Sequence, residues 1–371
     1  MINYRPTRAE ISLSALDHNF AVTRRLKGNA ALMAVVKAEA YGHGLVRVAQ
    51  EFSNLGADYL GVSFLEEGVI LREAGIRKPI LVMGGLVNEQ IERYLEYQLE
   101  ITVSSVYKAR QVEAIAAKYN KKATVQLKID TGMGRVGQQW HTADLLFDAI
   151  SRMKHLEING IYTHLATSDE ENLAFANTQL DRFDETLEKA QSFDLNPPFI
   201  HAANSGALMQ LSERSRYTMV RPGIMLYGYT PAQHLENLLD LQPAMTLRTQ
   251  IVFVKCPSKG AAIGYGATWK SPGNRWIATL PIGYGDGYPR ALSNKGWVLL
   301  LGRRCPVVGR ISMDQITVDA GNEAYIGDEV ILFGGSGERS LSLWEICKAI
   351  DTIPYELLCG LTSRVPRVYI K

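Results

Sequence analysis

The chain has 371 residues and is 46% hydrophobic, so it can bury a large core and we expect two domains. Its 40 Lys and Arg residues balance 38 Asp and Glu residues, and a net charge of +2 predicts no general attraction to nucleic acid or membranes. The four cysteines form no C-x-x-C pair, which is typical of reduced cytosolic thiols and does not favour a metal site. The first residues contain no apolar segment of signal-peptide length, and no run approaches the ~20 apolar residues of a membrane span, so we expect a cytoplasmic protein.

Strand and helix patterns alternate over residues 1–238. After a first strand at 9–13, Ser14 is placed to cap a helix that carries Leu16, Phe20 and Leu26 on one face and ends at Gly28. Eight strand candidates follow, namely the run that ends at Lys37 and residues 59–63, 80–83, 101–104, 124–129, 160–163, 199–202 and 219–221. Helical stretches separate them, among them 106–119 and one with Phe175, Leu180, Phe183 and Leu187 at helical spacing. Eight strand–helix units predict a closed (β/α)8 TIM-type barrel, with an open doubly wound sheet as the alternative.

From about Met245 the pattern changes to short β-rich runs, IVFVK, WIATLPI, WVLLL and VILFG, separated by Gly, Pro, Asn and Asp. Residues 239–371 are therefore predicted to form a mainly β C-terminal domain, with which the first ~10 residues are candidates to pair.

The segment AVVKAEAYGHG, residues 34–44, places Lys37 near the carboxyl end of a buried strand, followed by Tyr41 and a Gly-His-Gly turn. The carboxyl ends of strands are where α/β folds carry their chemistry. Partial burial favours an unprotonated amine, which could form a Schiff base with a carbonyl cofactor. The alternative is a surface lysine that follows a core strand.

The strand TVQLKID alternates, with Val125, Leu127 and Ile129 on the face expected to meet the helices. Lys128 then points into the barrel, where a bare ammonium is unfavourable. Carbamylation would make it an anion able to hold Arg135, and pairing with Asp130 is the alternative.

The loop TGMGRVG also contains a formal G-x-G-x-x-G at Gly132, Gly134 and Gly137. Its acidic residue, Glu157, precedes the next predicted strand instead of ending it, so we do not expect a dinucleotide site.

Polar residues at the ends of later strands fall on the same rim as Lys37. They are His164, Asn204, Ser205 and Arg221, with Gly223 and Ile224 beside the last. Loops after strands seven and eight are the usual phosphate cradle of such a barrel, although a lone histidine such as His164 is more often structural. An amine, a phosphate cradle and two arginines on one rim indicate a phosphorylated aldehyde, pyridoxal 5'-phosphate.

Several segments are similar, in order and over nearly the full chain, to the pyridoxal-phosphate alanine racemases. They are AVVKAEAYGHG, LKIDTGMGRVG, HAANSGA, VRPGIMLYG, IGYGATW, PIGYGDGYPR, GRISMDQITVD and RVPRVY. The resemblance implies that Lys37 forms the internal aldimine and that Tyr265, supplied by the partner subunit of a homodimer, is the second base that interconverts L- and D-alanine. It implies a phosphate site of Tyr41, Ser205, Gly223, Ile224 and Tyr355, Arg221 at the pyridine nitrogen, and His164 at the ring. It also implies that Arg135 meets the cofactor's phenolic oxygen and the substrate carboxylate, that Lys128 is carbamylated, and that Met313 and Tyr284 line the substrate entrance.

Three further readings remain open at this point. A broad-specificity racemase or a barrel-type pyridoxal-phosphate decarboxylase would use similar residues, although a decarboxylase would not need Tyr265 opposite Lys37. A non-catalytic pyridoxal-phosphate-binding protein would resemble the barrel alone.

Overall fold

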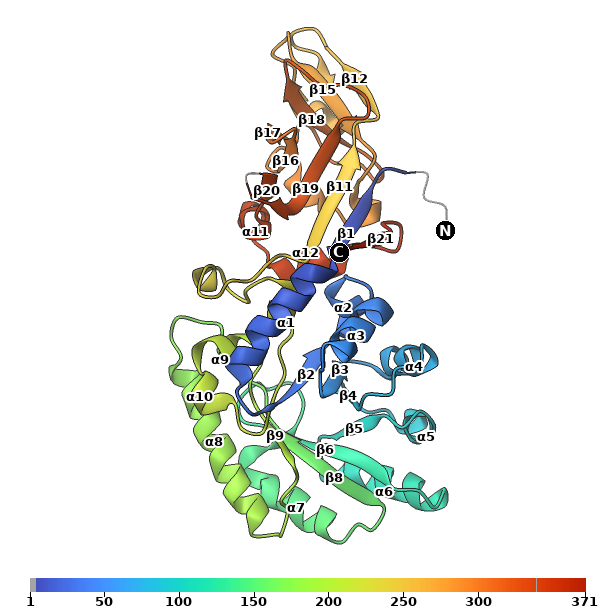
Figure 1. The fold of residues 1–371 in the computed structure, drawn as a ribbon, viewed down its shortest axis with the longest axis vertical. Helices are drawn as coiled ribbons and strands as arrows, with labels where there is room; N and C mark the ends of the chain where they lie inside the picture. Colours follow the sequence, from blue (N-terminus) through green and yellow to red (C-terminus); the bar gives the residue numbers. More distant parts are fainter. Residues whose placement is uncertain (1–4, 338) are drawn as a thin grey trace.

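A computed structural model describes residues 5–337 and 339–371, which form a barrel and a mainly β domain stacked end to end (Figure 1). The barrel, in blue to yellow-green, occupies the lower half of the view, and the β domain lies above it. None of the helices in the described ranges is both long and apolar enough to cross a bilayer.

The barrel is a ring of parallel strands. Within the described residues they are β2 (Ala31–Val35), β3 (Tyr59–Val62), β4 (Ile80–Val82), β5 (Glu100–Val103), β6 (Ala123–Asp130), β8 (Leu156–Tyr162), β9 (Phe199–His201) and β10 (Met219–Val220). Neighbouring strands pair in the order β10-β2-β3-β4-β5-β6-β8-β9, and the short β7 (Gln138–Gln139) pairs with β6. Between β9 and β10, Thr218 N donates to Ile200 O (3.1 Å) and Arg221 N to Ala203 O (2.8 Å), which closes the ring. The predicted (β/α)8 barrel is confirmed over the open sheet.

Helices surround the ring. They are α1 (Leu13–Lys27), α2 (Lys37–Tyr41), α3 (Leu45–Asn54), α4 (Leu65–Glu73), α5 (Ile91–Glu96), α6 (Val106–Lys118), α7 (Ala143–Ser151), α8 (Ala174–Gln191), α9 (Ser205–Gln210) and α10 (Ser212–Ser215). The cap of α1 differs from the prediction: Ser12 has extended backbone and its hydroxyl accepts from Ala15 N, whereas Ser14 already lies inside the helix. In α8, Leu180 and Phe183 are buried but Phe175 is 39% exposed, because it lies over the Gly132 loop instead of the core.

The second domain consists of two main sheets and two helices. Its strands are β1 (Arg8–Ser12), β11 (Met245–Gln250), β12 (Phe253–Lys255), β13 (Ala262–Ile263), β14 (Trp269–Lys270), β15 (Trp276–Leu280), β16 (Trp297–Leu300), β17 (Arg303–Pro306), β18 (Ile316–Gly321), β19 (Glu329–Ser336), β20 (Arg339–Leu341) and β21 (Arg367–Ile370). The larger sheet has the order β17-β16-β19-β11-β1-β21, the smaller β12-β15-β18. The helices are α11 (Leu343–Ile350) and α12 (Pro354–Gly360).

Contacts near the barrel rim connect the domains, among them those of β1 and of α12. Strand β1 lies between β11 and β21, although α1, which follows it, belongs to the barrel (Figure 1). Helix α12 packs on α2 at Gly42, where a Cβ would lie 2.0 Å from Leu358 O and where φ is 78°. Glycine at this position therefore lets the second domain reach the barrel rim. The predicted boundary between residues 238 and 239 stays a prediction.

Candidate functional site

A cavity of about 430 Å³ opens at the carboxyl ends of the barrel strands and is bordered on one side by Tyr355 of α12. Its lining includes most of the residues singled out in the sequence: Lys37, Tyr41, Lys128, Arg135, His164, Asn204, Ser205, Arg221, Gly223, Ile224 and Tyr355. The described lining residues include four side chains that ordinarily carry positive charge and one acid, Asp169. Such a surface favours an anionic ligand.

Lys37 follows β2 directly and opens a left-handed turn. Residues 38–41 all have φ between 52° and 55°, although none of them is glycine or asparagine. This conformation costs roughly 1–2 kcal/mol per residue, so neighbouring groups must hold it in place. Burial, and then the charge of Arg135, lower the pKa of the Lys37 amine, which increases its neutral, nucleophilic fraction.

Glu67 of α4 anchors this turn. Its carboxylate accepts from Ala38 N at 2.6 Å, from Ser63 N at 2.7 Å and from Phe64 N at 3.1 Å. One side chain therefore ties the turn after β2 to the loop after β3. No motif in the sequence pointed to Glu67.

A cradle of small groups lies beside the lysine. Ser205 Oγ accepts from Gly223 N at 2.9 Å, and a Cβ on Gly223 would lie 2.2 Å from Tyr41 Oη. Burial raises the pKa of both Tyr41 and Tyr355, so each hydroxyl keeps its proton and is available as a donor. Hydroxyl and backbone N–H donors of this kind suit a phosphate group.

Arg221 is only 4% exposed and is fixed by three hydrogen bonds. Its Nη1 donates to His201 Nδ1 at 2.7 Å, and its Nη2 donates to Thr163 O at 2.7 Å and to Ala202 O at 3.2 Å. Burial lowers the pKa of the guanidinium to about 10, so it stays protonated at neutral pH. The cavity thus contains a donor that does not release its proton.

Lys128 points into the cavity, as the alternation of its strand predicts. Its Nζ lies 4.5 Å from the centre of the Tyr162 ring and has no hydrogen-bond partner among the described residues. Burial, followed by Arg221 and Arg135, holds the pKa of this amine well below its usual range. The predicted alternative, an ion pair with Asp130, is absent within the described ranges.

Asp130 instead organises the glycine-rich loop. Its carboxylate accepts from Gly132 N at 2.9 Å and from Gly134 N at 3.1 Å. These N–H groups are thereby occupied, which agrees with the expectation that the loop does not cradle a dinucleotide. Glu157 lies inside β8 and not before it as predicted, but near the start of the strand, the wrong end for a ribose-binding acid.

His164 and Asn204 occupy the same rim. Burial, and then the charge of Lys128, hold the pKa of His164 well below its usual range, so the imidazole is neutral. The amide oxygen of Asn204 caps α9 by accepting from Ala207 N at 2.9 Å, and it also accepts from Ser168 Oγ at 2.8 Å. The structure thus gives the Asn204 side chain a capping contact next to the cavity.

The structure does not place Tyr265, Tyr284 or Met313 in the cavity of their own chain. All three belong to loops of the β domain and are 72%, 43% and 52% exposed. Tyr265 stands between Gly264 and Gly266, both with positive φ, and a Cβ on Gly266 would lie 2.9 Å from Arg310 Nη1.

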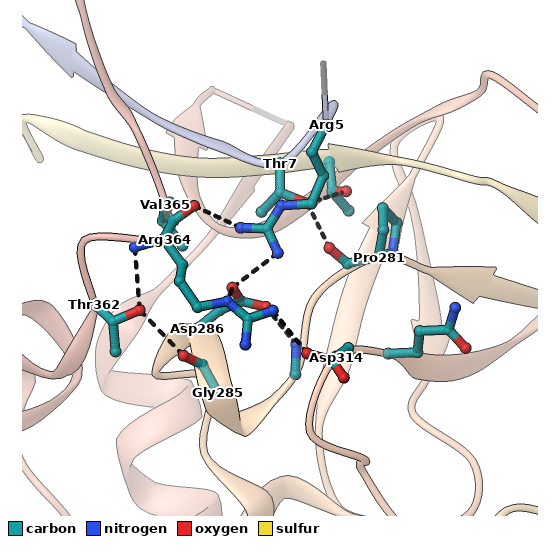
Figure 2. Close-up of polar contacts among 12 residues, drawn as sticks. Arg5, Thr7, Pro281, Gly285, Asp286, Asp314, Thr362, Arg364 and Val365 are labelled. Carbon is teal, nitrogen blue, oxygen red and sulfur yellow. Dashed lines mark hydrogen bonds and ion pairs between the residues drawn. The ribbon is translucent and has the colours of Figure 1, made fainter. Parts of the chain in front are cut away.

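Polar contacts hold the loops of Tyr284 and Met313 together (Figure 2). The fully buried carboxylate of Asp286 accepts from Arg5 Nη1 (2.8 Å) and Gly283 N (3.0 Å) and pairs with Arg364 Nε (3.1 Å). Arg364 also donates to Asp314 at 2.7 Å, and Gly285 N donates to Met313 O at 2.9 Å. The exposed side chains therefore project from a fixed base, which we call the Asp286 cluster (Arg5, Asp286, Asp314 and Arg364).

Fold and site together define a two-domain barrel enzyme that presents a lysine, a phosphate-sized cradle and several cations on one rim. Residues 11–231 match the model for "Alanine racemase, N-terminal domain" and residues 244–369 that for "Alanine racemase, C-terminal domain". The chain belongs to the alanine racemase family, whose members are pyridoxal-phosphate-dependent isomerases.

Relatives of known name agree with this assignment. An alanine racemase of Desulforamulus reducens is 44% identical over 98% of this chain and 99% of its own, and one of Halothermothrix orenii is 42% identical over 98% and 97%. The solved alanine racemase of Clostridium difficile superposes with a TM-score of 0.94 at 36% identity, covering 100% of this chain and 97% of that one. The Bacillus anthracis enzyme, described with bound L-Ala-P, gives 0.94 at 33% identity, covering 100% and 96%.

Proposed function

We propose that this chain is an alanine racemase that interconverts L- and D-alanine with pyridoxal 5'-phosphate and supplies D-alanine for peptidoglycan. It would act in the cytoplasm as a homodimer with shared sites. The observation that carries the proposal is the cavity itself, which combines Lys37 with a cradle and four basic side chains in a chain that matches the family over both domains.

The residues present fit the cofactor. Only glycine at 223 leaves room beside the Tyr41 hydroxyl, and Ser205 lies at the same point, so a phosphate would meet donors from Tyr41, Ser205, Tyr355 and the backbone at Gly223 and Ile224. Lys37 would be the amine that holds the aldehyde, with His164 beside the ring and Asn204 at the rim. When bound, the cofactor supplies an electron sink that acidifies the hydrogen on the substrate α-carbon.

Arg221 would limit that electron sink. Because the guanidinium donates a hydrogen bond and keeps its proton, a ring nitrogen facing it stays unprotonated. This hydrogen bond would weaken the electron sink that the cofactor supplies, so the return of a proton to the α-carbon would be favoured over side reactions. This restraint suits racemisation.

Two bases on opposite faces would move the proton. The amine of Lys37, whose pKa burial lowers, would serve the face on which D-alanine carries its α-hydrogen. The other face requires a group that this chain does not bring to its own cavity. We assign it to Tyr265 of the partner subunit, since Tyr265 is 72% exposed on the second domain.

The substrate carboxylate would meet Arg135. Lys128, an orphaned buried amine with a strongly lowered pKa, suits carbamylation: its nitrogen attacks CO2, loses one proton and becomes an anion. That anion would hold Arg135 by a charge-assisted bond. Met313 and Tyr284, in the loops that the Asp286 cluster holds, would line the substrate entrance of the neighbouring subunit.

The alternatives have less support. The match of residues 244–369 to the C-terminal domain of the family argues against a non-catalytic protein that resembles the barrel alone. A decarboxylase has no use for a second base at Tyr265. A broad-specificity racemase remains the closest competitor, because the cavity does not define the side chain of the substrate.

A coupled assay tests the proposal by measuring D-alanine formed from L-alanine, with other amino acids as competing substrates. In parallel, borohydride reduction followed by mass spectrometry should place a pyridoxyl group on Lys37. Release of CO2 in place of D-alanine, or an adduct on another lysine, would contradict the assignment.

A further inference from the structure

A chain of buried hydrogen bonds runs from Arg221 through the barrel core to its opposite end. Arg221 Nη1 lies 2.7 Å from His201 Nδ1, His201 Nε2 lies 2.6 Å from Gln126 Oε1, and Gln126 Nε2 lies 2.7 Å from Glu100 Oε2. The four side chains are between 0% and 7% exposed. Behind Arg221, His201 opens the HAANSGA segment and Gln126 lies in the TVQLKID strand, and neither these two residues nor Glu100 is assigned a role above.

The chemistry of the two ends fixes the direction of every bond. Arginine has no acceptor, so His201 Nδ1 must accept and its Nε2 must carry the hydrogen. That hydrogen points to Gln126 Oε1, so the amide nitrogen of Gln126 must donate to Glu100. The chain therefore has one polarity, which begins at a fixed donor and ends at an acceptor.

Glu100 is built to be that final acceptor. Tyr59 Oη donates to its Oε1 at 2.9 Å, and Asn159 Nδ2 donates to the same oxygen at 2.9 Å and to Tyr59 Oη at 2.7 Å. With Gln126, three donors and no acceptor face the carboxylate among the described residues. Burial raises the pKa of Glu100, and the bonds from Gln126, Tyr59 and Asn159 oppose that rise.

We propose that Glu100, at the far end of the barrel, is a positioning residue that sets the polarity of the Gln126–His201 chain and thereby orients Arg221 for catalysis. The inference deepens the proposed function, because it concerns the group assigned to the cofactor's ring nitrogen. Glu100 also supplies a negative charge to a core that contains the Arg221 guanidinium, which lies 5.2 Å from the centre of the Tyr162 ring.

Glu100→Gln would reverse this polarity while keeping the shape. The oxygen of the new amide would stay with the two donors Tyr59 and Asn159, so its NH2 group would face the amide nitrogen of Gln126, donor against donor, and Gln126 would have to flip. Its amide nitrogen would then face His201 Nε2, which would have to accept, and the hydrogen would move to Nδ1 against Arg221. A donor–donor contact at the Glu100 end of the hydrogen-bond chain would thus change the hydrogen bond of Arg221 in the cavity, although no residue that lines the cavity is substituted.

The double variant Glu100→Gln with Gln126→Glu should repair the chain. It moves the carboxylate one link closer to His201, where it accepts from His201 Nε2, while the new amide at position 100 donates to it and accepts from Tyr59. The matched control is Glu113→Gln, since Glu113 accepts from His155 at 2.9 Å on the outside of the barrel.

The experiment measures the tautomer of His201 by nitrogen-15 NMR of the full-length holoenzyme, assigned with His201→Asn, together with kcat and KM for alanine. We expect hydrogen on Nε2 in the wild type, in Glu113→Gln and in the double variant, and its loss from Nε2 in Glu100→Gln. We expect kcat of Glu100→Gln to fall about tenfold or more, as for partners behind metal-bound histidines, with KM changed far less.

Two results would overturn the proposal: a His201 tautomer unchanged in Glu100→Gln, or a double variant no better than the single one. If Glu100→Gln does not fold, Gln126→Met ends the chain one link earlier, leaves the hydrogen on His201 Nε2 without its acceptor and must also lower kcat with KM changed far less; an unchanged kcat there has the same meaning. Absence of racemisation in the wild type would instead contradict the proposed function and leave the tautomer result standing.

Discussion

The functional side chains of the barrel site are buried, whereas those of the β-domain loops are exposed. In the barrel, Lys37, Lys128 and Arg221 line an enclosed cavity, and burial lowers the pKa of all three. On the β domain, Tyr265 and Tyr284 stand in solvent, 72% and 43% exposed. Interior groups are tuned by desolvation, whereas the exposed tyrosines are fixed only by the loops beneath them.

This difference indicates that the barrel holds the reacting groups of its own cavity, whereas the β domain offers side chains that could complete the cavity of another subunit. The cavity lining includes Lys37 but not Tyr265 of the same chain. We assign the second face to the exposed Tyr265, and the Asp286 cluster holds the neighbouring loops of Tyr284 and Met313 in the same domain. If the two regions work together across subunits, substitutions in one region should be rescued by an intact copy of the other.

The largest effect is expected from Lys37→Ala and Tyr265→Phe. Each alone should lower racemisation by ~100-fold to 10,000-fold, the effect of a positioned acid–base group. Co-refolded, the two should recover about a quarter of the wild-type activity, because half of randomly paired dimers contain one intact site. Coupled assay of the mixture measures this. Recovery of none, with dimers present by light scattering, would place both bases in one subunit.

Isotope exchange sharpens the assignment of the two faces. In deuterated water, Tyr265→Phe should still exchange the α-hydrogen of D-alanine through Lys37, while exchange from L-alanine falls by orders of magnitude. NMR of the recovered amino acids gives both rates. Equal losses for the two enantiomers would mean that Tyr265 mainly holds the site together.

Lys128→Ala tests whether Lys128 supports Arg135 inside the barrel cavity. Without an anion beside it, Arg135 loses its support, and we expect kcat to fall about tenfold with partial recovery in chloride or a small carboxylate. Lys122→Ala, at an exposed lysine, serves as control. Intact mass of the wild type under bicarbonate should show the carbamate, and an unmodified lysine there would remove this role.

Asp286→Asn weakens the Asp286 cluster, which supports the loops of Tyr284 and Met313 on the β domain. The buried carboxylate serves two arginines that are 26% and 44% exposed, so water softens the loss and we expect about 2 kcal/mol of destabilisation. Thermal unfolding and dimer dissociation should both shift. Asp314→Asn, whose side chain is 61% exposed, should shift them far less. Equal shifts would show that the cluster is not the base of these loops.

The effect that is smallest near neutral pH concerns acid stability. Burial lowers the pKa of His43 to about 4, below its ordinary 6.5, so between these values the unfolded chain binds more protons than the folded one. Stability should therefore fall as pH drops from 6.5 to about 4, by about 3 kcal/mol from this residue. The pH slope of the unfolding midpoint should flatten in His43→Gln and not in His141→Gln, at an exposed histidine.

The sequence by itself determined the strand order of the barrel and the rim that carries its chemistry. Alternation in TVQLKID placed Lys128 inside, and glycine after the run that ends at Lys37 marked the carboxyl end of a strand. These are local signals, because side-chain direction repeats every two residues along a strand and turns need particular residues. The same logic misplaced the cap of α1 by two residues, since Ser12 and Ser14 are equally suited to cap and only the backbone chooses between them.

Tertiary structure alone decided the left-handed turn at residues 38–41, its anchor at Glu67 and the chain from Arg221 to Glu100. Each depends on groups from different strands, helices and loops that meet only when the barrel closes. Gln126 and Glu100 are 26 residues apart, and His201 and Gln126 are 75 apart. Spacing along the chain carries no signal at these separations, whereas closure of a ring of strands brings such residues within hydrogen-bonding distance.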